Sequence, residues 1–124
     1  MPGPEILQVD KSVSFIDQVN ADAGPVVLVN MFYVPAQSAQ AALQCYERDA
    51  AFMKTQPGFI SSQMHRGIGG SSVFVNYAIW ESAAALKAAR LKPEFRELVD
   101  RFPEGVTAMP VLLQKIAIPN VCVA

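Results

Sequence analysis

Two polar side chains, Asn76 and Trp80, stand four residues apart in a stretch of sequence that is otherwise almost entirely apolar. Residues 72–81 are typical of a strand, and alternation along a strand places both side chains on one face. Asparagine is depleted in strands, and burying its amide unpaired costs about 1–3 kcal/mol. An amide that costs stability at such a position is a candidate for binding a ligand.

A structural role is the alternative for each of these residues. Trp80 could be a core aromatic that anchors a helix to the sheet, and Asn76 could bond to a group on a neighbouring helix. His65, the only histidine, could be a surface residue at a strand end or a general base that titrates near neutral pH. Arg96 could be a solvated helix residue or could pair with a substrate anion. Asn30, a second strand amide, could line the same pocket or lie between two subunits.

Several other patterns indicate structure more than chemistry. The glycines at 67, 69 and 70 resemble a phosphate loop, but a strand follows them where a helix N-terminus would be needed, so a hairpin turn is favoured. Residues 47–49 look like a solvated helix face. Cys45 and Cys122 are isolated thiols without metal-site spacing, so no metal is expected.

Composition restricts the classes of protein that fit. A chain of 124 residues with 52% hydrophobic and 17% charged residues indicates one globular domain. A net charge of −1 makes nucleic acid and anionic membrane poor partners. The longest uncharged run is interrupted by prolines and polar residues, and residues 1–9 lack the features of a secretory signal. We therefore expect a cytoplasmic protein that neither binds nor crosses a membrane.

The order of predicted elements indicates an α+β fold. It is strand, helix, strand, strand, helix, strand, which matches the ferredoxin-like βαββαβ arrangement of an antiparallel sheet with two helices on one face. The expected strands are 25–35, 59–67, 72–81 and 108–118, with helices beginning at Ser38 and Ser82 and a break or restart at Pro93. We expect residues 1–24 to form an N-terminal arm with a possible short helix, 25–118 the domain, and 119–124 a C-terminal tail.

The sheet face away from the helices is predicted to be apolar. Strands 25–35, 72–81 and 108–118 carry hydrophobic residues at both parities, while two helices can cover only one face. Soluble monomers avoid large exposed apolar patches. The sequence therefore predicts a homodimer in which two sheets pack face to face.

Two segments together resemble the antibiotic biosynthesis monooxygenase family of dimeric α+β barrel proteins. They are Pro-Gly-Phe-Ile-Ser-Ser-Gln-Met-His-Arg (57–66) and Phe-Val-Asn-Tyr-Ala-Ile-Trp-Glu-Ser (74–82). The resemblance implies oxidation of a small or polycyclic aromatic phenol or anthrone by O₂, with no metal, flavin or haem. It implies that Asn76 and Trp80 hold the substrate oxygen and the activated dioxygen. It also places His65 and Arg96 at positions like those of the family pocket.

This chain departs from the family pattern at one position of the expected pocket. Quinone-forming relatives carry a tyrosine where this chain has Leu86, which favours the alternative of a non-catalytic ligand-binding or stress-response protein of the same fold. The ligand is expected between the sheet and the helices. The expected lining consists of Phe74, Asn76 and Trp80 from the strand, Leu43, Tyr46 and Leu86 from the helices, and His65 and Arg96 near the mouth.

Overall fold

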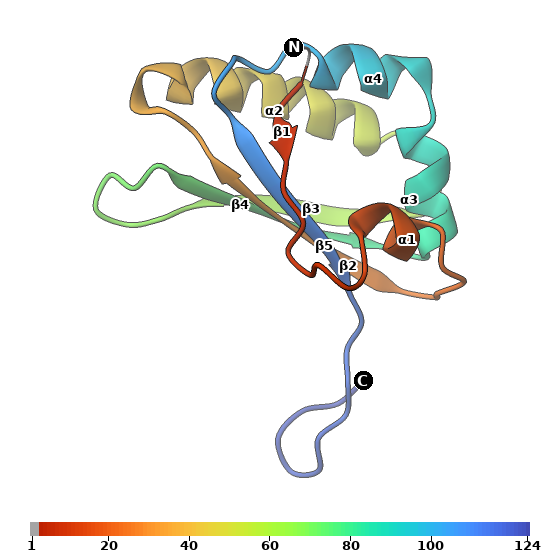
Figure 1. Cartoon of the computed structure of the whole chain (residues 1–124). Coiled ribbons are helices and arrows are strands. Elements are labelled where there is room, and N and C mark those ends of the chain that lie inside the picture. The colour runs from red at the N-terminus through yellow and green to blue at the C-terminus, as the bar shows by residue number, and fades with distance from the viewer. Residues whose placement is uncertain (1–2) are drawn as a thin grey trace.

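A five-stranded sheet carries the helices on one of its faces (Figure 1). The computed structural model describes residues 3–124. The order across the sheet is β1-β5-β2-β4-β3, and all neighbours are antiparallel except the parallel pair of β1 and β5. The expected ferredoxin-like α+β fold is confirmed. The strands are β1 (Glu5–Ile6), β2 (Val26–Tyr33), β3 (Phe59–Arg66), β4 (Val73–Trp80) and β5 (Thr107–Leu113).

The helices begin and end close to where capping residues and proline predict. They are α1 (Phe15–Val19), α2 (Ala39–Met53), α3 (Ala83–Arg90) and α4 (Pro93–Val99), with a short 3₁₀ turn η1 (Ala36–Ser38) before α2. The Ser82 hydroxyl caps α3 by accepting a hydrogen bond of 3.0 Å from the Ala85 amide. Ser38 stands at the cap position of α2 but makes no side-chain cap, because η1 already precedes that helix. Pro93 starts α4 at its first position.

The register of β2 against β4 decides which side chains meet the helices. Asn30 lies opposite Asn76, and Val26 lies opposite Trp80. Alternation from these pairs turns Phe74, Ala78 and Trp80 toward the helices, where all three are buried. Within residues 3–124, no helix lies over the opposite face of the sheet (Figure 1). That face carries Val27, Val29, Met31, Tyr33, Val73, Val75, Tyr77, Ile79, Met109, Val111 and Leu113.

The N-terminal segment adds to the sheet and to the core. The Leu7 amide donates to the Ala108 carbonyl at 2.9 Å, which joins β1 to β5. The Gln18 side-chain oxygen accepts a hydrogen bond of 2.9 Å from the Leu112 amide. Phe15 and Val19 of α1 are buried in the same cluster as Trp80. The arm expected for residues 1–24 is therefore, over the part that is described, packed on the domain, and a domain boundary at residue 24 stays a prediction.

The last strand is shorter than predicted. β5 ends at Leu113, where the sequence pattern suggested a strand to residue 118. Residues 114–124 continue away from the domain (Figure 1) and close a turn in which the Ile118 amide donates to the Cys122 carbonyl at 2.9 Å. β2, the neighbour of β5, begins at Val26, and Val27 pairs with Leu113, so few β2 residues are left to pair with a longer β5. Within residues 3–124, no helix is both long and apolar enough to cross a membrane.

Replacing Phe15 with alanine should lower the free energy of unfolding by about 3 kcal/mol, because it empties a buried aromatic site. The neighbouring Ile16 is more than half exposed and provides the matched control, with Ile16→Ala expected to change stability by about 0.5 kcal/mol or less. Urea unfolding of both variants measures the two values. Equal effects would show that α1 does not belong to the core.

Candidate active site

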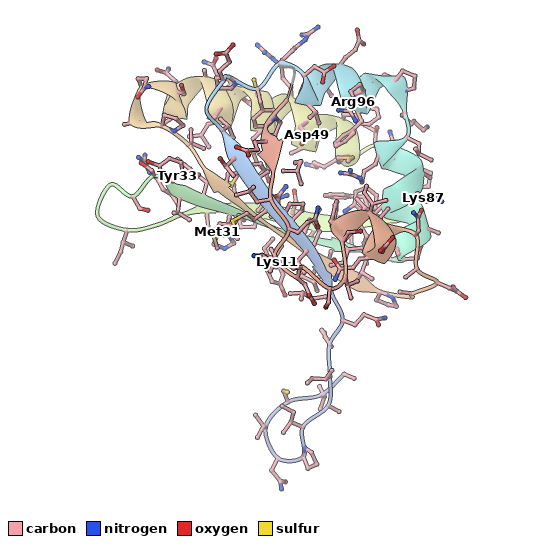
Figure 2. All side chains as sticks on the ribbon, viewed as in Figure 1. Lys11, Met31, Tyr33, Asp49, Lys87 and Arg96 are labelled. Atoms are coloured by element: carbon pink, nitrogen blue, oxygen red, sulfur yellow. The ribbon has the colours of Figure 1, made fainter. Side chains whose placement is uncertain are left out.

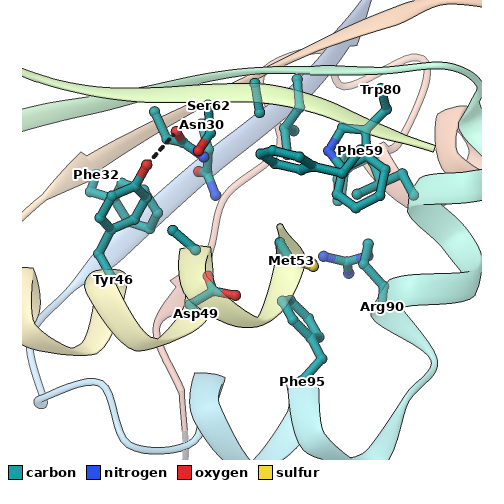
Figure 3. Close-up of a pocket in the computed structure, with 16 residues that line it drawn as sticks. Asn30, Phe32, Tyr46, Asp49, Met53, Phe59, Ser62, Trp80, Arg90 and Phe95 are labelled. Atoms are coloured by element: carbon teal, nitrogen blue, oxygen red, sulfur yellow. Dashed lines mark hydrogen bonds between the residues drawn. The ribbon is translucent and has the colours of Figure 1, made fainter. Parts of the chain in front are cut away.

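A cavity with mostly apolar walls and a few polar side chains lies between the helix-facing side of the sheet and helices α2, α3 and α4 (Figure 3). It encloses about 60 Å³. An outer groove of about 370 Å³ adjoins it and reaches the N-terminal segment and α4. The two spaces share Phe15, Asn30, Phe32, Asp49, Arg90 and Phe95.

Asn76 and Tyr46 are joined inside the cavity. The Tyr46 hydroxyl, from α2, donates to the Asn76 side-chain oxygen at 3.0 Å (Figure 3). The amide nitrogen of Asn76 is then left to donate to another group. Burial is the main effect on the pKa of Tyr46 and raises it; Ser62 lowers this pKa and the Asp49 charge raises it, and the net rise keeps the phenol protonated at neutral pH. Tyr46, predicted as part of an apolar wall, is therefore a hydrogen-bonding member of the site.

Trp80 lines the inner end of the cavity, where Phe59 holds it. The two rings meet edge to face, with centroids 5.3 Å apart and planes at 90°. Gly58 allows this contact, because its φ is +85° and a Cβ there would lie 2.4 Å from the Ala85 Cβ on α3. The Pro-Gly-Phe sequence thus sets how closely strand β3 approaches helix α3. Leu86, only 1% exposed, adds an apolar wall beside Trp80, as expected.

Asp49 points into the cavity, which corrects the sequence interpretation of residues 47–49 as a solvated helix face. It extends from α2 toward the space between helices and sheet (Figure 2, Figure 3). Its Oδ1 atom is buried and has no hydrogen-bond partner within the described residues. Burial raises the pKa of the Asp49 carboxyl to about 6, and the attraction of Arg90 opposes that rise.

Arg90, at the end of α3, is the second charged group of the cavity. Its guanidinium carbon lies 4.9 Å from the ring centre of Phe15 and 5.5 Å from that of Phe95. Burial lowers the pKa of Arg90, as does the positive charge of Arg96, while Asp49 raises it. Sequence reasoning missed this residue, although its spacing of four from the buried Leu86 was a usable signal.

Asn30 faces the cavity from β2, which resolves the alternatives left open by the sequence. Its side-chain oxygen is buried without a hydrogen-bond partner in the described chain, like that of Asp49. Two unpaired acceptors therefore face one small space. Each costs stability unless a donor reaches it, and a ligand with hydroxyl groups could supply such donors.

Three other predicted residues lie near the cavity without lining it. Phe74 and Leu43 border a separate, smaller apolar pocket together with Met64. Arg96 lies at the outer groove, where its side chain is mostly exposed and sits 3.7 Å from the Asp100 carboxylate. The expected mouth position of Arg96 agrees with this placement, whereas Phe74 and Leu43 are walls of a different space.

His65 is on the opposite face of the sheet, so its predicted place at the cavity mouth is wrong. It pairs with Val75 of β4, whose side chain lies on the uncovered face, and its Nδ1 atom is 3.2 Å from the Val75 carbonyl oxygen. The cause is a register shift between Phe59 and Ser61, which inserts one residue and reverses the alternation of β3. Ser62 lines the cavity in its place.

Neither cysteine belongs to the site. Cys45 is buried on α2 with its thiol directed at the Arg101 carbonyl, 3.2 Å away, and Cys122 is exposed in the tail. In residues 3–124 there is no group of three or more His, Cys, Asp and Glu side chains that could hold a metal ion.

The sequence of this chain matches a known protein family. The family profile described as antibiotic biosynthesis monooxygenase matches residues 25–101. Deoxynogalonate monooxygenase of Streptomyces nogalater is 34% identical over 74 residues, which are 60% of this chain and 62% of that protein. The match therefore spans less than two thirds of that relative's length.

Solved structures share the fold. A candidate monooxygenase from Shewanella loihica PV-4 is 33% identical, with a TM-score of 0.64 over 77% of this chain and 98% of that chain. SnoaB, a cofactor-independent oxygenase from Streptomyces nogalater, is 24% identical, with a TM-score of 0.66 over 79% of this chain and 99% of that chain. At this identity the likeness to SnoaB shows the fold.

Asp49→Asn should stabilise the protein at pH 8 but not at pH 4. A carboxyl whose folded pKa is raised disfavours the folded state as pH rises from its unfolded pKa to about 6, and the full cost is present above that. The amide side chain of the variant carries no charge at any pH. The increase in the free energy of unfolding over the parent should therefore be about 2 kcal/mol larger at pH 8 than at pH 4. Urea unfolding at both pH values measures this, with the exposed Glu47→Gln as control. A gain that is the same at both pH values would contradict the burial of the Asp49 charge.

Proposed function

The chain belongs to the antibiotic biosynthesis monooxygenase family, and on that basis we propose that it is a cofactor-independent monooxygenase that oxidises an aromatic phenol or anthrone with O₂. The observation that carries the proposal is that two side chains with neutral hydrogen-bond donors, Asn76 and Trp80, line the same small, largely apolar cavity. Neutral donors in a space of low dielectric stabilise a developing oxyanion without neutralising it.

The chemistry requires few groups from the protein. An aromatic enol or phenol that loses its proton becomes a carbanion equivalent, which can pass an electron to O₂ directly. The Asn76 side-chain oxygen accepts a hydrogen bond from Tyr46, which leaves its amide N–H groups free to donate to the substrate oxygen in this proposal. The walls made by Phe59, Trp80 and Leu86 limit water around the reacting atoms.

The sizes of the two spaces suggest how they divide the ligand. The inner cavity of about 60 Å³ corresponds to roughly two waters at the liquid volume of about 30 Å³ each, which suits O₂ and the reacting edge of a ring. The outer groove of about 370 Å³ falls in the range of small-ligand sites, about 300–1,000 Å³. In this proposal the groove receives the body of the aromatic substrate and the cavity its reactive end.

A non-catalytic ligand-binding protein of the same fold is the second candidate. The observation that favours it is Leu86, which is fully buried at the position where quinone-forming relatives carry a tyrosine. Helix α3 therefore contributes an apolar side chain, Leu86, to the cavity. Among the described residues that line the cavity, Tyr46 on α2 supplies the only phenol.

Oxygen uptake by metal-free protein with a panel of anthrones and hydroquinones tests the proposal. Asn76→Ala should lower kcat by about 10²–10³-fold, as removal of one oxyanion donor does in other enzymes. The variant should stay folded, which circular dichroism checks. Gln44→Ala, on the exposed side of α2, is the control and should leave kcat unchanged. Tight binding of the panel with no oxygen uptake would support the binding protein instead.

We propose further that two copies associate through the uncovered sheet face. Its apolar residues would otherwise form a patch larger than soluble monomers usually expose. Val75 lies on this face, half buried and away from the cavity. Sedimentation at micromolar concentration should show a dimer, and Val75→Asp should shift it toward monomer, while Glu47→Gln should not. A monomeric parent protein would contradict the dimer.

A further inference from the structure

The Asp49 carboxylate is placed to receive a proton from a molecule in the cavity. It lines both the inner cavity and the outer groove, so anything that spans them passes it. Its Oδ1 atom is buried and accepts no hydrogen bond within residues 3–124. Figure 3 shows the carboxylate directed into the same space as Asn30 and Arg90.

Charged and titratable groups reach Asp49 from each side. Arg90 approaches from α3, held between Phe15 and Phe95, and Tyr46 lies one turn earlier on α2. Arg96 of α4 acts on Arg90 and not directly on Asp49. Asp49 makes no ion pair within the described chain. The Asp49 carboxylate therefore lies in the field of the Arg90 positive charge, while its Oδ1 atom is free to accept a proton or a hydrogen bond.

Among the residues that line the cavity, Asp49 is the one suited to act as a base. Asn30 and Asn76 are neutral amides. Tyr46 holds its proton, since burial raises its pKa, and it already donates to Asn76. The pKa of Asp49, raised to about 6, leaves the group ionised at neutral pH and close to the value at which a general base is most effective.

We propose that Asp49 is the catalytic residue that removes the hydroxyl or enol proton of the aromatic substrate and later returns it to the peroxide. This inference rests on the oxygenase function proposed above. The O–H bond of the enol breaks, its proton moves to the Asp49 carboxylate, and the electron pair is left on the substrate as enolate.

The remaining steps balance with O₂ as the oxidant. The enolate carbon transfers one electron to O₂, and the resulting radical and superoxide combine to form a C–O bond. The protonated Asp49 gives its proton to the peroxide anion and is a carboxylate again. Loss of water from the hydroperoxide, which takes the remaining hydrogen from that carbon, leaves a carbonyl. One substrate CH₂ and one O₂ thus become one C=O and one H₂O.

The first test follows oxygen uptake with dithranol across pH 5–9. In the parent protein kcat/KM should rise through an ionisation near pH 6, and in Asp49→Asn that rise should be lost, with kcat/KM at pH 7 lowered by at least about 10²-fold. Asp49→Glu should restore part of the rate, and Glu47→Gln should behave like the parent. At pH values where dithranol ionises in solution, Asp49→Asn should recover activity, because no base is then needed.

The outcomes separate this inference from the function on which it rests. Normal turnover and an unchanged pH profile in Asp49→Asn, with kcat still lowered about 10²–10³-fold in Asn76→Ala, would overturn the role of Asp49 and leave the oxygenase standing. No oxygen uptake by the parent protein would overturn the oxygenase and, with it, the proton-transfer step.

A second test needs no turnover. Emodin carries hydroxyl groups that can donate to a carboxylate, whereas anthraquinone, with the same three rings, has none. The parent protein should prefer emodin, and Asp49→Asn should reduce that preference about tenfold while binding anthraquinone as the parent does, since a hydrogen bond to a charged acceptor is lost. An unchanged preference would show that Asp49 does not meet the ligand hydroxyl, and would overturn the inference.

Discussion

The pairing of β2 with β4 is the constraint on which the site depends. Their register sets Asn30 opposite Asn76 and turns both amides toward the helices. Because side chains alternate with a period of two, a slip of β4 by one residue would move Asn76 and Trp80 to the opposite face and separate them from Asn30. The apolar residues that now lie on that face would enter the cavity instead. One ladder of backbone hydrogen bonds thereby places the two amides in the cavity and leaves the opposite face of these two strands apolar.

Much of the fold follows from local patterns, whereas the charged part of the site does not. Proline boundaries, the Ser82 cap and strand alternation predict the antiparallel strands, the helices and the face occupied by Asn76 and Trp80. Asp49 escaped prediction because it stands beside two other charged residues, and a run of charges usually marks a solvated face. Its spacing of three from Tyr46 and four from Met53 nevertheless places it on the buried stripe. The position of a helix relative to a cavity comes from tertiary packing, which periodicity alone does not encode.

His65 shows a different limit. Counting by alternation from Phe59 puts this histidine on the cavity face, and the count fails because one extra residue enters β3 just after Phe59. No residue type in that segment announces the shift. The same shift brings Ser62 to the cavity, so a single inserted residue exchanges a titratable ring for a hydroxyl. Local sequence patterns tend to fail at functional sites, and here the register shift changes which β3 side chain faces the cavity.

The hydrogen bond from the Leu112 amide to the Gln18 side chain has a consequence for the behaviour of the protein in solution. A sheet whose outermost strand has free amides can recruit a strand from another molecule and grow into an aggregate. Along β5 the backbone at Ala108 is paired with β1, Pro110 has no N–H, and the Leu112 N–H is taken by Gln18. This side of the sheet therefore offers an incoming strand few donors. The N-terminal segment, which lies outside the family match, thus covers backbone donors along β5 and also lines the outer groove.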